Sequence, residues 1–480
     1  MATTQTRLGE FGILLGGGSH ETGETYEIAS PYDGSPVAVV HRATPDDVER
    51  AIAGAVAAFE TTRHLPSWRR EEILAAISQG IAERRDELAE TIALEAGKPL
   101  KTALGEVDRA TFTFKVAAEE AKRIYGEIVP LDWLPGNEGR RGEVRRVPLG
   151  VIAGISPFNF PLNLVSHKVA PALAAGNPIL LRPASQTPVA ALKLGEIVYA
   201  AGWPADAFAV LPCSTETARP LVEDDRIKKL SFTGSPEVGW ALKQRAGRKR
   251  VTLELGGNAA VIVAEDADVD YAAERIAWGG FSYAGQTCIS VQRVYVHEQV
   301  YDRFVSELVR RVEELKVGDP LDPDTDVGPL IDTANADRVE EWLEEAKAAG
   351  AEVLTGGERE GSVWRPTVLA GAGAELRVSC QEVFAPLLTV TRFDDVDEAI
   401  EAAGRSEFGL QGGIFTNDLR VIEKAFDRIE VGGLIVNDVS AFRIDHMPYG
   451  GVRASGLGRE GLRYAIEEMT ELKLLAINAR

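Results

Sequence analysis

The stretch VIAGISPFNFPLNLVSHKVAPALAAGNPILLRPASQTPVAALKLGEIVYAAG, residues 151–202, decides the fold. Two short apolar runs alternate in it with two longer segments in which apolar residues recur three and four positions apart. This pattern predicts strand, helix, strand, helix, at residues 151–155, 163–175, 178–181 and 189–201. Gly176 and Gly202 follow the predicted helices, and glycine is the residue that most often ends a helix.

The alternation continues on the C-terminal side of this stretch, with predicted strands at residues 208–211, 229–232 and 251–255. Strands that alternate with helices predict a parallel, doubly wound α/β sheet with helices on both faces. A second alternating block follows Gly256-Gly257, with strands predicted at 260–263, 292–297 and 387–392 and helices at 300–315 and 333–349. Two such blocks predict two domains with a cleft between them.

On the N-terminal side, residues 45–95 are predicted to be mostly helical, because charged and apolar residues interleave at helical spacing. Thr44 is the predicted N-cap, and Pro45 the first helical residue. Pro66 is predicted to divide this segment into two helices, because proline removes a backbone donor.

The composition excludes several classes of protein. The chain has 480 residues, too many for one typical core. No run of about 20 apolar residues exists, and a polar start favours the cytoplasm over export. A net charge of -21 disfavours nucleic acid. Three scattered cysteines and six scattered histidines predict neither a disulfide framework nor a metal site.

Three polar residues are candidates for chemistry. Cys288, in GQTC, is either a small buried hydrophobe or a thiolate nucleophile beside Gly285, which would let a ligand approach the backbone. Glu254 ends an apolar strand before two glycines, and is either a strand-end charge or a general base whose pKa is raised by apolar neighbours. Asn159 follows the strand at 151–155, and is either a turn residue or an oxyanion donor.

The run GSPEVG, residues 234–239, follows a predicted strand and opens a helix. A glycine turn at a helix N-terminus can hold a pyrophosphate. The run does not match GxGxxG, and many ordinary turns look like it.

Taken together, these segments resemble the aldehyde dehydrogenase superfamily over nearly the whole chain. Seven motifs carry the resemblance, in the order that the family has them: SPFNFP at 156–161, HKVAPALAAGN at 167–177, SFTGSPEVG at 231–239, LELGGN at 253–258, GQTC at 285–288, EVFAP at 382–386 and PYGGVRASGLGREG at 448–461. The resemblance implies a Rossmann-like cofactor domain, a second α/β catalytic domain and a small β extension for oligomerisation. The boundaries it suggests are 7–124 with 148–255 for the NAD(P)-binding domain, 256–440 for the catalytic domain, and 125–147 with 462–480 for the oligomerisation segments.

The resemblance also implies catalytic roles. Cys288 is similar to the nucleophile that forms a thiohemiacetal and then a thioester, and Asn159 to the side-chain donor of the oxyanion hole. Glu254 is similar to the base that activates water against the thioester, and Lys168 to a member of the proton relay behind it. A CoA-acylating enzyme is the alternative, but that branch typically lacks the glutamate, and a non-catalytic protein on the same scaffold is a further one.

The cofactor implied is NAD or NADP. Glu382 is similar to the residue that holds the nicotinamide ribose, with Phe384 nearby. The positions that resemble the family's cofactor-binding residues are Ser156, Phe158, Arg182, Ser185, Gly234, Ser235, Gly239, Leu255, Glu382 and Phe384. Arg182 stands where the family usually has Lys, and Ser185 where NAD-preferring members often have Glu, which repels a 2′-phosphate. The sequence therefore predicts that NADP is accepted.

The run at 442–449 resembles the branch of lactaldehyde, semialdehyde and non-phosphorylating glyceraldehyde-3-phosphate dehydrogenases. Within it, Arg443 either faces an anionic or hydroxylated aldehyde or is a surface residue. Thr287 stands where enzymes acting on the phosphorylated aldehyde tend to have Arg, which favours a small polar substrate. The oligomerisation segments imply a homodimer or homotetramer.

Overall fold

Five parallel strands form the centre of the first sheet in the computed structural model, which describes residues 6–479. They are β8 (Val151–Ile155), β9 (Ile179–Arg182), β10 (Phe208–Val210), β11 (Ile227–Thr233) and β12 (Arg250–Glu254). Their spatial order is β10-β9-β8-β11-β12, so the chain winds outward from β8 in both directions. This is the doubly wound order that the sequence predicted, with its switch point between β8 and β11.

Short antiparallel strands extend this sheet at both edges. β2 (Ile13–Leu15) and β3 (Gly18–His20) lie beyond β10, and β24 (Gly456–Leu457) pairs with β12. The pairing of β24 returns the C-terminal part of the chain to the first sheet. A separate three-stranded sheet near the N-terminus contains β1 (Gly9–Phe11), β4 (Thr25–Ala29) and β5 (Pro36–His41).

Helices cover both faces of the first sheet. On one face α5 (Asn163–Ala175) and α6 (Val189–Ala200) contact the strands, and three further helices pack outside them: α2 (Ser67–Glu83), α3 (Arg85–Ala96) and α4 (Leu100–Glu120). On the other face lie α1 (Pro45–Thr62), α7 (Arg219–Glu223) and α8 (Pro236–Arg245). Every residue of β8 is buried, as expected for a strand that is covered on both faces.

The N-terminal helices follow the predicted signals with one difference. Thr44 caps α1 through a reciprocal hydrogen-bond pair with Asp47, and Pro66 separates α1 from α2. A second break occurs at Arg84, whose φ of -104° and ψ of 23° separate α2 from α3. Three helices therefore replace the two that the sequence predicted. The second break was missed because no proline or glycine marks it in the sequence.

The second sheet has seven strands in the order β15-β18-β19-β14-β13-β21-β22. They are β13 (Ala259–Val263), β14 (Val291–His297), β15 (Glu352–Thr355), β18 (Thr367–Ala370), β19 (Leu387–Phe393), β21 (Gln411–Phe415) and β22 (Gly433–Val436). One face packs against α9 (Val269–Phe281), α10 (Glu298–Glu313) and α11 (Thr333–Ala348), and the other against α13 (Val396–Gly404) and α14 (Leu419–Arg428). The α/β fold class is confirmed for both blocks.

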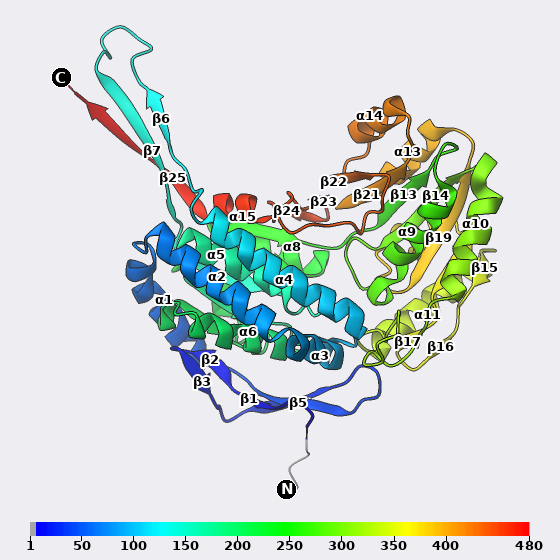
Figure 1. Ribbon diagram of the computed structural model, residues 1–480, viewed down its shortest axis with the longest axis horizontal. Coiled ribbons are helices and arrows are strands. Elements are labelled where there is room, and N and C mark those ends of the chain that lie inside the picture. Colours follow the sequence, from blue (N-terminus) through cyan, green and yellow to red (C-terminus); the bar gives the residue numbers. More distant parts are fainter. Residues whose placement is uncertain (1–5, 480) are drawn as a thin grey trace.

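Three antiparallel strands form an arm that projects from the rest of the molecule, with the C-terminus at its end (Figure 1). They are β6 (Glu127–Pro130), β7 (Arg140–Pro148) and β25 (Thr470–Asn478), in the order β25-β7-β6. The predicted segment 462–480 also contains a helix, α15 (Leu462–Glu468), before β25. In the part of the chain that the structure describes, no helix is both long and apolar enough to cross a bilayer.

Candidate active site

A cavity of about 340 Å³ lies where β8, β11 and β12 end, facing the second sheet. Nine of the residues predicted from the sequence line it: Phe158, Asn159, Gly234, Ser235, Glu254, Leu255, Cys288, Glu382 and Phe384. The position agrees with the rule that open parallel sheets bind ligands at the carboxyl ends of their strands, near the switch point. Residues separated by more than 200 positions in the sequence are therefore brought into one site.

Cys288 follows a strained loop between α9 and β14. Tyr283 and Ala284 adopt left-handed backbone conformations, with φ of 51° and 52°, which cost energy for residues with side chains. The Tyr283 hydroxyl anchors the loop by donating to the carbonyl of Ala96 at 2.9 Å. A Cβ at Gly285 would lie 2.2 Å from the Ala385 carbonyl oxygen. Gly285 thus admits backbone rather than a ligand, which corrects the prediction.

Cys288 lines the cavity, and its sulfur lies 3.0 Å from the Tyr449 hydroxyl. Burial raises the pKa of this thiol to about 12, although the hydrogen bond from Tyr449 acts in the opposite direction. Burial therefore disfavours the thiolate in the protein alone. Only the thiolate is a strong nucleophile, so binding of a cationic ring or a base beside it would favour reaction.

Asn159 lies beside the nucleophile loop. Its side-chain amide donates to the backbone carbonyl of Gln286 at 3.0 Å. An amide nitrogen carries two hydrogens, so a second donor remains for an oxygen in the cavity. The loop that carries Cys288 thus fixes the orientation of this donor.

Glu254 ends β12 inside the cavity wall. The residue is buried, and neither carboxyl oxygen has a hydrogen-bond partner. Burial, followed by the charge of Glu460, raises its pKa well above the usual value. A buried acid with no partner that borders a cavity has the properties of a general base. The two glycines after it allow close packing, because a Cβ at Gly256 would meet Glu382 at 2.4 Å and one at Gly257 would meet the Cys288 carbonyl oxygen at 2.2 Å.

Lys168 lies behind Glu254 and is completely buried. Its ammonium donates to the Thr233 hydroxyl at 2.6 Å and to the Ser231 hydroxyl at 3.3 Å, and lies 3.6 Å from the Glu460 carboxylate. Burial lowers the pKa of Lys168. Burial alone would raise the pKa of Glu460, but Lys168 and His167 hold it below its usual range.

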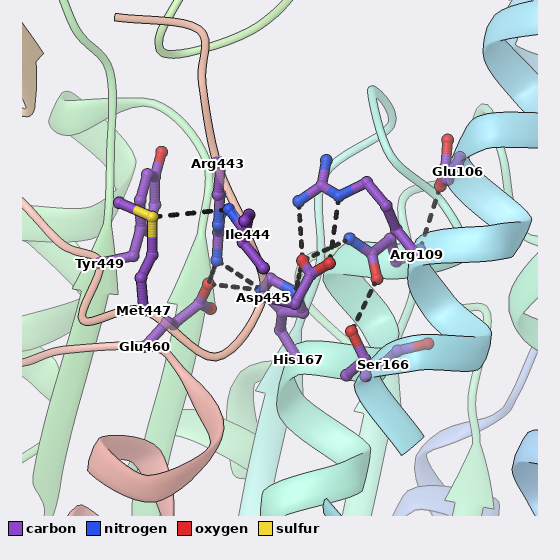
Figure 2. A network of polar contacts seen from close by, with 12 residues as sticks. Glu106, Arg109, Ser166, His167, Arg443, Ile444, Asp445, Met447, Tyr449 and Glu460 are labelled. Atoms are coloured by element: carbon purple, nitrogen blue, oxygen red, sulfur yellow. Dashed lines mark hydrogen bonds and ion pairs between the residues drawn. The ribbon is translucent and has the colours of Figure 1, made fainter. Parts of the chain in front are cut away.

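Glu460 is the centre of a buried polar network that the sequence analysis did not identify (Figure 2). Its carboxylate contacts Arg443 at 2.9 Å and His167 at 3.0 Å. His167 contacts Asp445 at 2.7 Å, and Asp445 accepts from Arg109 at 2.7 Å. The network thus runs from Lys168, beside the base, to Arg109 on α4.

The side chain of Arg443 is buried and is held by polar and aromatic partners. Its side chain is 6% exposed, and its guanidinium lies 3.5 Å from the centre of the Tyr449 ring. It also donates to Glu460, and a terminal nitrogen lies 2.6 Å from Nδ1 of His167. Arg443 is therefore not a surface residue of this chain, and its role as a substrate contact stays a prediction.

The residues predicted for the cofactor fit a dinucleotide. Gly234 and Ser235 line the cavity and precede α8, and the N-terminus of a helix favours a pyrophosphate. A Cβ at Gly239 would meet Leu255 at 2.4 Å, so Gly239 lets α8 pack closely on the strand end. The Ser156 hydroxyl is buried with no partner, which leaves a donor free beside β8.

Glu382 accepts a hydrogen bond from the backbone N–H of Gly257 at 2.8 Å. Burial raises its pKa to about 7, and its carboxylate can accept from sugar hydroxyls. Phe384, with φ of 52°, packs edge-on against Phe158 with ring centres 5.9 Å apart. Arg182 ends β9, where it donates to the Cys213 carbonyl at 3.2 Å, and Ser185 is partly exposed.

A second cavity, of about 600 Å³, lies on the other side of the nucleophile loop, and Thr287 and Ile289 line it. Arg109 lines this cavity too, and so does Phe160, which follows Asn159 in the sequence. The ε nitrogen and one terminal nitrogen of Arg109 pair with Asp445. Its other terminal nitrogen has no carboxylate partner among residues 6–479, so it can bind an anion.

A cavity-lining thiol and an unpaired buried carboxyl at the carboxyl edge of a doubly wound sheet are typical of an oxidoreductase that combines covalent catalysis with a dinucleotide. The chain belongs to the aldehyde dehydrogenase family, whose model matches residues 19–475. Its activity is the NAD(P)-dependent oxidation of an aldehyde.

Individual relatives resemble the chain over nearly its whole length. It is 46% identical over 477 residues to 3-sulfolactaldehyde dehydrogenase of Priestia aryabhattai, a match that covers 99% of this chain and 100% of the relative. The structure of aldehyde dehydrogenase 21 from Physcomitrella patens in complex with the reaction product succinate gives a TM-score of 0.97 at 43% identity, over 98% of each chain. Glyceraldehyde-3-phosphate dehydrogenase from Methanocaldococcus jannaschii, in complex with NADP, gives 0.91 at 38% identity, over 95% of this chain and 100% of the other.

Proposed function

We propose that this aldehyde dehydrogenase oxidises a short aldehyde that carries an anionic group at its far end. The observation that carries the proposal is the position of Arg109, which lines the second cavity with one terminal nitrogen unpaired, on the opposite side of the nucleophile loop from the dinucleotide cavity. An aldehyde whose carbonyl reached Cys288 would then extend its other end toward this guanidinium.

The relatives support an anionic substrate. The names 3-sulfolactaldehyde, succinate and glyceraldehyde 3-phosphate all describe short carbon chains with an anionic group. Thr287 replaces the arginine that would favour a phosphate, so a sulfonate or carboxylate is the preferred group. Planar donors of arginine bind both of these oxyanions well.

The reaction follows from the residues of the site. The Cys288 thiolate adds to the carbonyl carbon, and the Asn159 amide donates to the oxygen that becomes negative. The carbon then loses its hydrogen as a hydride and a thioester remains. Glu254 takes a proton from water, whose oxygen adds to the thioester, and the carbon–sulfur bond breaks to release the acid. We propose that Lys168 and Glu460 carry the proton away from Glu254.

We propose that the cofactor lies in the cavity next to β8. Gly234 and Ser235 would hold the pyrophosphate at the N-terminus of α8, and Glu382 would hold the nicotinamide ribose. Arg182 and Ser185 would face the adenosine ribose. When bound, NAD or NADP supplies the hydride acceptor.

Transfer of the acyl group to CoA is the alternative for the last step. Glu254, whose carboxyl oxygens are buried and unpaired, favours water as the acceptor. Added CoA should therefore leave the rate of turnover unchanged, and NADH should form from NAD and an aldehyde without CoA.

A comparison of two four-carbon aldehydes, one with a terminal carboxylate and one without, tests the substrate class. Arg109→Gln is expected to raise KM for the carboxylate about tenfold or more, because a charge-assisted hydrogen bond contributes about 1.5–3 kcal/mol. KM for the neutral aldehyde should stay within a factor of about two. Arg85→Gln, which removes an arginine paired with Asp108 on the surface, is the matched control. Equal losses for both aldehydes in Arg109→Gln would contradict the proposal.

We further propose that the arm of β6, β7 and β25 joins subunits of a homodimer or homotetramer. Its apolar side chains are exposed in the single chain, among them Ile128, Leu472 and Leu474.

We propose residues 7–124 with 148–255 as the NAD(P)-binding domain and 256–440 as the catalytic domain, a division that the two sheets support. The three free cysteines support the reducing cytoplasm as the compartment.

A further inference from the structure

The Tyr449 hydroxyl is the one hydrogen-bond partner of the Cys288 sulfur among the residues that the structure describes, at 3.0 Å. Tyr449 comes from the segment between β22 and β24, far from Cys288 in the sequence, and is 3% exposed. Its ring packs against Ile289 and Leu410, beside the nucleophile. A buried phenol is thus held in contact with the atom that has to lose a proton.

Arg443 fixes and polarises this phenol (Figure 2). Its guanidinium lies over the face of the Tyr449 ring, 3.5 Å from the ring centre. Glu460 and His167 hold the guanidinium from the other side, at 2.9 Å and 2.6 Å. A cation at the face of a phenol favours negative charge on its oxygen, which makes the hydroxyl a stronger hydrogen-bond donor.

The groups around the Cys288 sulfur shift the pKa of its thiol in opposite directions. Burial has the largest effect and raises the pKa of the thiol, and the carboxyls of Glu382 and Glu254 raise it further. The Tyr449 hydrogen bond and the positive charge of Arg443 lower it. Tyr449 and Arg443 therefore both favour ionisation of Cys288.

We infer that Tyr449 is a further catalytic residue, whose hydroxyl donates to the Cys288 thiolate, and that Arg443 is the positioning residue that holds Tyr449 for this purpose. A thiolate has no hydrogen to donate, so in the ionised state the phenol is the donor, and a hydrogen bond to the charged form stabilises that form. The inference rests on the proposed role of Cys288 as nucleophile.

The test measures the reactivity of the sulfur itself. Tyr449→Phe keeps the ring and removes only the hydroxyl. Iodoacetamide alkylation of the cofactor-free enzyme is followed at Cys288 by peptide mass spectrometry, with the exposed Cys380 of the same chain as internal reference. Each unit by which the pKa of the thiol rises lowers the thiolate fraction about tenfold. On a logarithmic scale about half of this loss is offset, because a more basic thiolate is a better nucleophile. At each pH between 7 and 9, the rate constant at Cys288 is expected to be about threefold to tenfold lower in Tyr449→Phe than in the unaltered enzyme. The rate constant at Cys380 should be the same in both proteins.

Two further variants make the outcome decisive. Tyr199→Phe removes another tyrosine hydroxyl, one that donates to the Phe208 carbonyl in the first sheet, and should leave the Cys288 rate unchanged. 3-Fluorotyrosine at position 449 provides a more acidic phenol and should raise the Cys288 rate. An unchanged rate in Tyr449→Phe, or a fall with the fluorinated residue, would overturn the inference. Because alkylation needs no turnover, this result is independent of whether Cys288→Ala abolishes aldehyde oxidation, which tests the nucleophile.

Discussion

The side-chain amide of Asn159 donates a hydrogen bond to the backbone carbonyl of Gln286 at 3.0 Å. Asn159 follows β8 of the first sheet, and Gln286 precedes β14 of the second. The bond therefore crosses the cleft and aligns the proposed oxyanion donor with the loop that carries Cys288. Gln286 is held in turn, since its side chain accepts from the Ile331 amide at 2.9 Å and donates to the Pro329 carbonyl at 3.2 Å.

Removal of this amide should affect the chemical step more than binding. Asn159→Ala is expected to lower kcat about 10²-fold to 10³-fold, as is typical when one oxyanion donor is lost, with little change in cofactor affinity. Steady-state kinetics and cofactor titration measure the two effects. Asn335→Ala is the control, because Asn335 lines the same cavity but bonds to Asp332. A purely KM effect in Asn159→Ala would speak against the oxyanion role.

Replacement of the proposed base should separate the two halves of the reaction. In Glu254→Gln the aldehyde should still be oxidised once per site, because the thioester forms without the base, and hydrolysis should then slow about 10²-fold to 10⁴-fold. Rapid mixing should show a burst of NADH that matches the number of sites, followed by a slow phase. Cys288→Ala should give no burst. Steady turnover at the rate of the unaltered enzyme would exclude Glu254 as the base.

The pH dependence of hydrolysis follows from the same residue. Burial and Glu460 raise the pKa of Glu254 well above its usual value, and a base acts only when it is unprotonated. The hydrolysis rate should therefore rise with pH through this raised pKa, not through the range of an ordinary glutamate near 4.5. Single-turnover hydrolysis across pH measures this limb, which should be absent in Glu254→Gln.

The choice between cofactors should depend on Ser185. This partly exposed residue follows β9 near Arg182, whose guanidinium is held by the Cys213 carbonyl. Ser185→Glu is expected to lower kcat/KM for NADP about tenfold or more, because a carboxylate repels a 2′-phosphate, and to leave NAD almost unaffected. Gln186→Glu adds the same charge one residue further on and is the control. Strict exclusion of NADP by the unaltered enzyme would refute the prediction that both are accepted.

Local patterns predicted the first sheet and its helices closely. The predicted helix at 163–175 matches α5, whose C-cap Gly176 adopts the left-handed conformation with φ of 84°, a signal that the sequence carries directly. The break at Arg84 was not predicted, since a helix can end where packing turns the chain without proline or glycine. The pairing of β24 with β12 was not predicted either, because two residues carry no periodicity.

The candidate site likewise contains some residues that the sequence identified and others that it did not. Cys288, Glu254 and Asn159 lie in motifs whose resemblance to the family indicated them, and they share one cavity. Tyr449 and Arg109 were missed, because their contacts with Cys288 and Asp445 join positions that are far apart in the sequence. The orientation of the Arg443 side chain could not be predicted from the sequence either, since only the packed structure shows that this buried arginine stacks on Tyr449.

The arm provides a prediction about assembly. β25 is an edge strand of its sheet, and Leu472 and Leu474 are each 56% exposed on one side of it. An exposed apolar edge strand is a surface for pairing with another chain. Leu474→Glu is therefore expected to convert the homo-oligomer to a smaller species in light scattering, because burying an unpaired carboxylate in an interface is costly. Lys473→Glu, with the same new side chain on the other side of the strand, should keep the assembly. A monomer in the unaltered protein would contradict the prediction at its first step.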